Sequence, residues 1–254
     1  MSIITIATSK GGAGKTTLAS LILGTIASKG YRVAAIDSDY NHSLADWVNT
    51  FERYPITIRT ELDETKVIPL AAELSETHDL VVIDTAGAAM QATVFAIGCA
   101  DLVLIPCQLS SSDVVEAAKT QKLIVSAAAM TRQEIPARVV LTDYQAKTVV
   151  AGHVEREIAA CGLTSLETKL HRLVAYKEMT FTGDVPTEGP AAVQVSSLIE
   201  VLQGREVTIM NMIALTVAFG IAVDDTLHFL NLSLIHISEP TRRTPISYAV
   251  FCLK

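Results

Sequence analysis

The sequence predicts a doubly wound α/β fold, in which a mainly parallel sheet carries helices on both faces. Short apolar runs typical of buried strands alternate with helical stretches through the first 204 residues, and the first run leads through a glycine-rich turn into a helix. We expect strands near residues 2–8, 32–36, 79–84, 101–105 and 137–142. We expect helices near residues 15–29, 43–52, 66–76, 112–130, 148–161 and 191–202, the last ending before Gly204.

The glycine-rich turn follows the apolar run 3–7 and reads Ser9-Lys10-Gly11-Gly12-Ala13-Gly14-Lys15-Thr16-Thr17. A strand, such a turn and a helix form the setting of a phosphate-binding loop, because backbone N–H groups and the helix N-terminus attract phosphate oxygens. Lys15 would neutralise the β- and γ-phosphates, and the Thr16 hydroxyl would bind Mg²⁺. The expected phosphate-binding residues are Gly11, Gly12, Ala13, Gly14, Lys15, Thr16 and Thr17. The loop therefore predicts a nucleoside triphosphate as ligand.

Two further apolar runs end in acidic residues. Residues 32–36 lead into Asp37-Ser38-Asp39, and residues 80–83 lead into Asp84-Thr85-Ala86-Gly87. Open α/β sheets bind ligands at the carboxyl ends of their strands, so we expect these carboxylates to face the phosphates. Asp84 has the Walker B position and would hold Mg²⁺ through a water, while the Gly87 N–H would sense a γ-phosphate.

The loop departs from the strict phosphate-binding pattern, because Ser9 stands in place of a glycine and Lys10 follows it. In this form, K-G-G-x-G-K-T-T, it resembles the deviant Walker A loop of the ParA/MinD family of P-loop ATPases. The resemblance implies that Lys10 reaches across a dimer interface to the partner's nucleotide. It also implies that Asp37 helps to hold the water shell of Mg²⁺ and that Asp39 orients the attacking water.

Three other segments compare with the same family. Many ParA relatives continue D-x-D-P-Q-G, whereas this chain has Asp39-Tyr40-Asn41-His42, which resembles the VirC1-like branch linked to conjugative DNA transfer. The stretch 100–110, followed by Asp113, resembles the strand and loop after Walker B, where a proline and a serine lie beside the nucleotide. Residues 170–179 resemble the late-helix region, and relatives often contact the base near residues 141–144.

The resemblance implies ATP and Mg²⁺ as cofactors and an ATP-dependent homodimer as the working unit. That dimer would bind DNA non-specifically and position a plasmid, a chromosome or a transfer complex, and slow ATP hydrolysis would reset it. A DNA-binding adaptor or a relaxosome protein is the expected partner. Two alternatives stay open: a MinD-like regulator at a membrane surface, and a nucleotide-gated scaffold of a conjugative DNA-transfer complex.

Charge and cysteine content add little to this assignment. The chain carries 20 Lys and Arg against 27 Asp and Glu, a net charge of −7, so a basic DNA-binding surface would have to be local. The cysteines at 99, 107 and 161 form no metal-binding or disulfide pattern, and the N-terminus enters a strand without a signal peptide, which predicts a cytoplasmic protein. Candidate DNA contacts are Arg132, Arg138, Lys147, Arg156, Lys169, Arg172 and Lys177.

Residues 205–254 do not fit this domain, which we expect to span 1–204. Residues 207–223 carry no charge and are a borderline membrane span, but an interfacial helix would need basic residues, and none lies between Arg205 and Arg242. The stretch 211–230 resembles a segment of RND-type exporters, while 232–242 and 246–254 are what the two ends of a transposase-type sequencing adapter would encode. We interpret 205–231 as an exporter fragment joined in by assembly and 232–254 as translated adapter; the alternative is a natural apolar tail.

Overall fold

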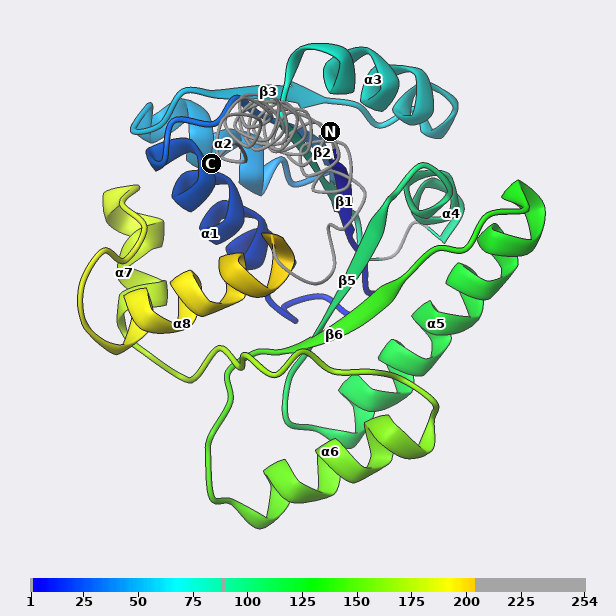
Figure 1. The fold of residues 1–254 in the computed structure, drawn as a ribbon, viewed down its shortest axis with the longest axis vertical. Helices are drawn as coiled ribbons and strands as arrows, with labels where there is room; N and C mark the ends of the chain where they lie inside the picture. The colour runs from blue at the N-terminus through cyan, green and yellow to red at the C-terminus, as the bar shows by residue number, and fades with distance from the viewer. Residues whose placement is uncertain (1, 88–89, 204–254) are drawn as a thin grey trace, which may run out of the picture. The chain divides into compact units, whose positions relative to one another are not determined.

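The computed structural model describes residues 2–87 and 90–203, and these contain one sheet with helices on both faces (Figure 1). Six parallel strands follow the order β3-β2-β4-β1-β5-β6. The strands are β1 (Ser2–Ile6), β2 (Val33–Ser38), β3 (Ile56–Thr60), β4 (Leu80–Thr85), β5 (Leu102–Cys107) and β6 (Ala137–Leu141). The predicted doubly wound α/β fold is confirmed, and the sheet is parallel throughout.

The helices divide between the two faces of the sheet. One hydrophobic core joins the sheet to α1 (Lys15–Ser28), α2 (Ser43–Phe51), α7 (Ala175–Thr182) and α8 (Gly189–Val201). The opposite face packs against α3 (Glu64–Thr77), α4 (Met90–Gly98), α5 (Ser111–Thr131) and α6 (Val149–Ala160). Because both faces are covered, strands β2, β4 and β5 are buried along their whole length instead of alternating between buried and exposed residues.

The glycine-rich loop 9–17 joins two elements that pack into one hydrophobic core. In β1, Ile4 and Ile6 are at most 1% exposed. Helix α1 packs into the same core through Leu18 and Ile22, which are both fully buried. Burial of each such side chain stabilises the fold by about 1.5–3 kcal/mol. The loop between Ile6 and Lys15 is therefore anchored at both ends by well-packed elements.

The carboxyl ends of the strands bring the acidic residues together. In the pairing of β2 with β4, Asp37 lies opposite Asp84, and Ile6 lies opposite Asp84 in the pairing of β1 with β4. Since β1 lies between β4 and β5, the loops that follow these strands open at one edge of the sheet.

The structure adds two elements that the sequence analysis missed and corrects one boundary. Strand β3 was missed because it lies at an edge of the sheet and is only half-buried, so it lacks the long apolar run of a buried strand. Helix α4 was missed because it carries no charged residue and so lacks the amphipathic pattern that marks a surface helix. In the region 170–179, residues 170–173 are not helical; His171 forms a bridge with Tyr144, and the helix begins at Ala175.

The segments 205–231 and 232–254, and the stop signal at Gly204, lie outside the described residues. Within residues 2–87 and 90–203, the structure has no helix long and apolar enough to cross a membrane.

Candidate active site

The glycine-rich loop ends in left-handed backbone conformations that suit glycine. Gly12 has φ 74° and Gly14 has φ 97°, and α1 begins at the next residue, Lys15. Gly14 occupies the N-cap position, and no side chain of the described residues caps the helix. The first N–H groups of α1 are therefore available to an anion, as the sequence predicted for a phosphate site.

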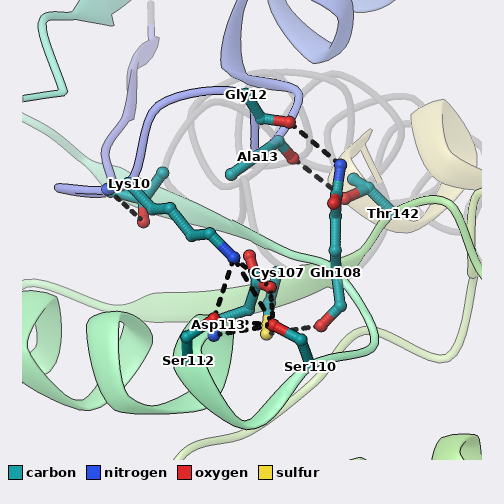
Figure 2. A network of polar contacts seen from close by, with 10 residues as sticks. Lys10, Gly12, Ala13, Cys107, Gln108, Ser110, Ser112, Asp113 and Thr142 are labelled. Carbon is teal, nitrogen blue, oxygen red and sulfur yellow. Dashed lines mark hydrogen bonds and ion pairs between the residues drawn. The ribbon is translucent and has the colours of Figure 1, made fainter.

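Two side chains from the ends of neighbouring strands fix the carbonyl groups of the loop. Gln108 donates from Nε2 to the carbonyl oxygen of Gly12 at 2.9 Å, and Thr142 donates from Oγ1 to that of Ala13 at 2.9 Å (Figure 2). With these carbonyls bound on one side, the loop keeps its N–H groups free for the other. Both residues lie in segments that were compared with the family, 100–110 and 141–144, but neither was predicted to bind the loop; the available signal was their position directly after β5 and β6.

Lys15 lies inside the loop with its amine close to the backbone. Its residue is 7% exposed, and Nζ donates to the carbonyl oxygens of Thr8 and Lys10, each at 3.4 Å. Burial lowers the pKa of Lys15, and the nearby carboxylates of Asp84 and Asp39 act in the opposite direction. Both bonds are long, so an incoming phosphate can replace them with shorter charge-assisted ones.

Gly87 lies against the loop where a larger residue would not fit without movement. A Cβ built there would be 3.3 Å from Lys15 Nζ and 3.4 Å from the Ser9 carbonyl oxygen. Gly87 thus lies close to Lys15, and its contact with a γ-phosphate stays a prediction.

Thr16 and Asp84 meet at the start of α1. Thr16 donates from Oγ1 to Asp84 Oδ2 at 2.8 Å, while Asp84 Oδ1 is buried with no hydrogen-bond partner among the described residues. Burial, with a smaller contribution from Asp37, raises the pKa of Asp84 to about 7. An unsatisfied buried carboxylate oxygen beside a hydroxyl fits a cation, which would supply the missing partner.

Asp37 is fully buried, and both of its oxygens already accept backbone hydrogen bonds. Oδ1 accepts from Asp39 N at 3.0 Å, and Oδ2 accepts from Leu44 N at 3.0 Å and from Ala45 N at 2.9 Å. Asp37 therefore fixes the start of α2, as the acidic residue at a helix start does. Its expected contact with the water shell of Mg²⁺ would add to these bonds.

The loop and the two Asp-containing segments enclose a hollow of about 800 Å³. Asp39 lines it together with Lys15, Thr16 and Gly87. A second hollow, of about 640 Å³, shares Gly12, Gly14 and Thr17 with the first and extends to Arg172. Among the described residues, no group of three or more His, Cys, Asp and Glu side chains could hold a metal by itself. Mg²⁺ usually takes only one or two carboxylates and completes its shell with water and phosphate.

Lys10 lies apart from these groups. Its Nζ donates to Asp113 Oδ2 at 2.6 Å and to Ser112 Oγ at 3.0 Å, both at the start of α5. Figure 2 shows the side chain extending from the loop to this cluster. Ser9, the residue before it, also bonds α5, through the carboxylate of Glu116. The two residues that distinguish this loop from the strict pattern thus both bind one helix.

Comparisons with known proteins show the family of this chain. A family model described as "VirC1 protein" matches residues 1–218. The chain belongs to the VirC1 family. ParA of Rhizobium radiobacter is 35% identical over 144 residues, which cover 56% of this chain and 64% of ParA. VirC1 of Rhizobium rhizogenes is 26% identical over 191 residues, 72% of this chain and 82% of that protein.

The chain matches only part of the length of some relatives, and solved structures share its fold. The chain spans 64% of the length of ParA and 57% of that of VirC1 from Rhizobium radiobacter. Apo McdA from Cyanothece superposes with a TM-score of 0.69 at 19% identity, covering 80% of this chain and 99% of that one. MinD of Aquifex aeolicus superposes with 0.65 at 19% identity, covering 81% and 98%. At these identities the two structures show that this member of the VirC1 family shares their fold.

The candidate DNA contacts of this VirC1-family chain are not equally available. Lys169 is paired with Glu155, and Arg172 is paired with Asp143 at 2.5 Å. Each of these pairs is close to neutral and would bind phosphate more weakly than an unpaired cation. Lys147 and Arg132 stand at exposed positions with left-handed backbone.

Proposed function

We propose that the chain is a ParA-type ATPase that binds and slowly hydrolyses Mg-ATP in the larger hollow. The observation that carries the proposal is the buried Oδ1 of Asp84, which has no hydrogen-bond partner among the described residues and lies beside Thr16. The loop before Thr16 leads into a helix N-terminus that no described side chain caps. Phosphate and Mg²⁺ together satisfy both features. Membership of the VirC1 family and the likeness to ParA support the same assignment.

Each residue of the hollow has a role in this proposal. Lys15 exchanges its two long backbone bonds for the β- and γ-phosphates, and Gly87 N–H faces the γ-phosphate. Thr16 and Asp84 would hold Mg²⁺, and Asp37 would contact the water molecules bound to it. Bound Mg²⁺ would neutralise the charge that develops on the transferred phosphoryl group. Asp39 orients the attacking water. The nucleoside half lies in the smaller hollow, beyond Thr17.

The working unit in this proposal is a homodimer that forms with ATP. Lys10 is bound to Asp113 in the single chain, so it must leave that ion pair to reach a partner's nucleotide. Dimer formation thus replaces the bond from Lys10 to Asp113 with a bond from Lys10 to the partner's nucleotide. Dimer formation therefore depends on a bound triphosphate.

The ATP dimer binds DNA non-specifically in this proposal, and a DNA-binding adaptor or a relaxosome protein stimulates its ATPase. With a net charge of −7, the chain would need a local basic patch, doubled by dimerisation. Phosphate contacts release counterions, so affinity should fall steeply with salt.

Sedimentation and DNA binding test this proposal directly. The full chain, with Mg²⁺ and ATP or ADP, is sedimented alone and then titrated against a DNA duplex at several salt concentrations. We expect dimers and DNA binding with ATP but monomers with ADP, and a loss of affinity of about tenfold or more between 50 and 200 mM salt. Equal DNA binding with ATP and ADP would count against the proposal.

A second candidate function is favoured by the match to the VirC1 model. In it, ATP binding without hydrolysis gates a scaffold of a conjugative DNA-transfer complex. ATP-dependent capture of a relaxase by the chain should then be the same in the Asp39→Ala variant, whereas the cycling ATPase requires hydrolysis for release.

A further inference from the structure

The carboxylate of Asp39 is held by the residue two positions further along the chain. Asn41 donates to Asp39 Oδ1 twice, from its backbone N and from its side-chain Nδ2, each at 3.0 Å. One of these donors belongs to the side chain, so it depends on residue 41 being an asparagine. Residue 41 also lies in the segment where the sequence departs from the D-x-D-P-Q-G form.

The backbone of this turn is fixed without help from the Asn41 side chain. Asp39 N donates to Asp37 Oδ1 at 3.0 Å, and His42 N donates to the Asp39 carbonyl oxygen at 3.0 Å. The first turn of α2 is fixed in the same way, because two of its backbone N–H groups donate to Asp37 Oδ2. Removal of the Asn41 amide should therefore leave the turn in place and change only the Asp39 side chain.

The two hydrogen bonds from Asn41 distinguish the two oxygens of Asp39. Oδ1 accepts both of them, while no hydrogen bond to Oδ2 occurs among the described residues. The terminal torsion of an aspartate is broad, so a carboxylate without such bonds rotates freely. With Oδ1 bound, Oδ2 keeps one direction in the hollow that Asp39 and Asn41 line together with Lys15.

We propose that Asn41 is a positioning residue that directs Asp39 Oδ2 toward the attacking water. This inference rests on the proposed ATPase function. In the step concerned, the water oxygen bonds to the γ-phosphorus, and the bond from that phosphorus to the β–γ bridging oxygen breaks. The electron pair of the broken bond stays with ADP, and both water protons end on the released phosphate as H₂PO₄⁻. Asp39 Oδ2 accepts a hydrogen bond from the water and fixes its approach.

Two variants of the full chain test the role of the amide. Asn41→Ala removes the side-chain donor, and Asn41→Asp keeps the shape but replaces the donor with an acceptor that repels Asp39. Asn49→Asp makes the same chemical change at an exposed position of α2 and is the matched control. Single-turnover hydrolysis of radiolabelled Mg-ATP gives the rate, and titration gives the dissociation constant.

We expect both Asn41 variants to hydrolyse ATP about tenfold or more slowly, with dissociation constants within about twofold of the wild type. Asn49→Asp should match the wild type in both. A double-mutant cycle separates positioning from a general structural effect. In the Asp39→Ala background, Asn41→Ala should cause no further loss, because no carboxylate remains to be positioned.

Three results would overturn the inference. Wild-type rates in both Asn41 variants would show that the amide does not act on the reaction. An additive loss in the Asp39→Ala background would show that Asn41 acts through the fold. Both results leave the ATPase itself in place, whereas no hydrolysis by the wild-type chain above the Asp39→Ala rate would remove the proposed function along with the inference.

Discussion

Lys10 and Asp113 form an ion pair between the glycine-rich loop and the first turn of α5, with 2.6 Å between Nζ and Oδ2. The Asp113 side chain is 2% exposed and that of Lys10 is 33% exposed. The pair is therefore buried on the acid side and open to water on the lysine side. Lys10 can leave without being desolvated, but its departure leaves a buried carboxylate with one bond fewer.

Neutralising the acid should favour the dimer. Asp113→Asn keeps an acceptor for the Ser110 hydroxyl but removes the charge that holds Lys10. We expect its ATP-dependent dimer to be about 3–10 times tighter than that of the wild type, by sedimentation. Glu134→Gln, which removes an exposed acid just beyond α5, is the control. Wild-type or weaker dimerisation of Asp113→Asn would contradict a competition between Asp113 and the partner's nucleotide.

Loss of the lysine itself should have the opposite effect. In Lys10→Ala we expect no ATP-dependent dimer, although the chain should still bind ATP because Lys15 and the loop N–H groups remain. Sedimentation with ATP and a nucleotide titration together check this. Full dimerisation and turnover in Lys10→Ala would refute the deviant-loop assignment.

Lys15→Ala should abolish nucleotide binding without unfolding the chain. Among the described residues the buried amine has only two hydrogen bonds, both long, so its removal costs little stability, whereas the phosphates would lose their nearest cation. We expect at least about a hundredfold weaker binding of Mg-ATP, by titration calorimetry. Lys29→Ala, at the exposed C-cap of α1, should bind as the wild type does.

Asp84 predicts a pH dependence of stability in the nucleotide-free protein. Its pKa is about 7 in the folded state, above the ordinary value of 3.8, chiefly because the charged form is desolvated. Between these two values the unfolded chain loses its proton while the folded chain keeps it, so the folded state loses stability as the pH rises from about 4 to about 7.

Asp84→Asn should remove this loss of stability at rising pH and should also abolish any stabilisation of the folded chain by Mg²⁺. With EDTA present, we expect the variant to be more stable than the wild type at pH 8 by about 1–3 kcal/mol, or roughly 2–10 °C, with a smaller difference at pH 5. Thermal unfolding at the two pH values measures this. A larger gain at pH 5 than at pH 8 would give the wrong sign and argue against a desolvated carboxylate.

The sequence could predict the parts of the site that follow directly from strand ends. The loop 9–17 and the acidic residues after β2 and β4 are local features, and the parallel sheet brings them together because its carboxyl ends share one edge. Gly87 was identified in the same way and lies against Lys15.

Other parts of the site depend on contacts between segments far apart in the sequence. Gln108 and Thr142 bond the loop from 96 and 129 residues away, and nothing in their own segments marks that role. The partner of Lys10 is 103 residues away. The helix expected within 170–179 begins only at Ala175, because His171 pairs with Tyr144 in a β-bridge and the residues around it are not helical.

Magnesium-dependent phosphate release from ATP tests the central claim most directly. It is measured for the full chain beside Lys15→Ala and Asp39→Ala, with an EDTA control. We predict slow release by the wild type, none with EDTA or in Lys15→Ala, and at least about a hundredfold less in Asp39→Ala, which should still bind ATP and persist as a dimer. A wild-type rate no higher than that of Lys15→Ala would contradict the account.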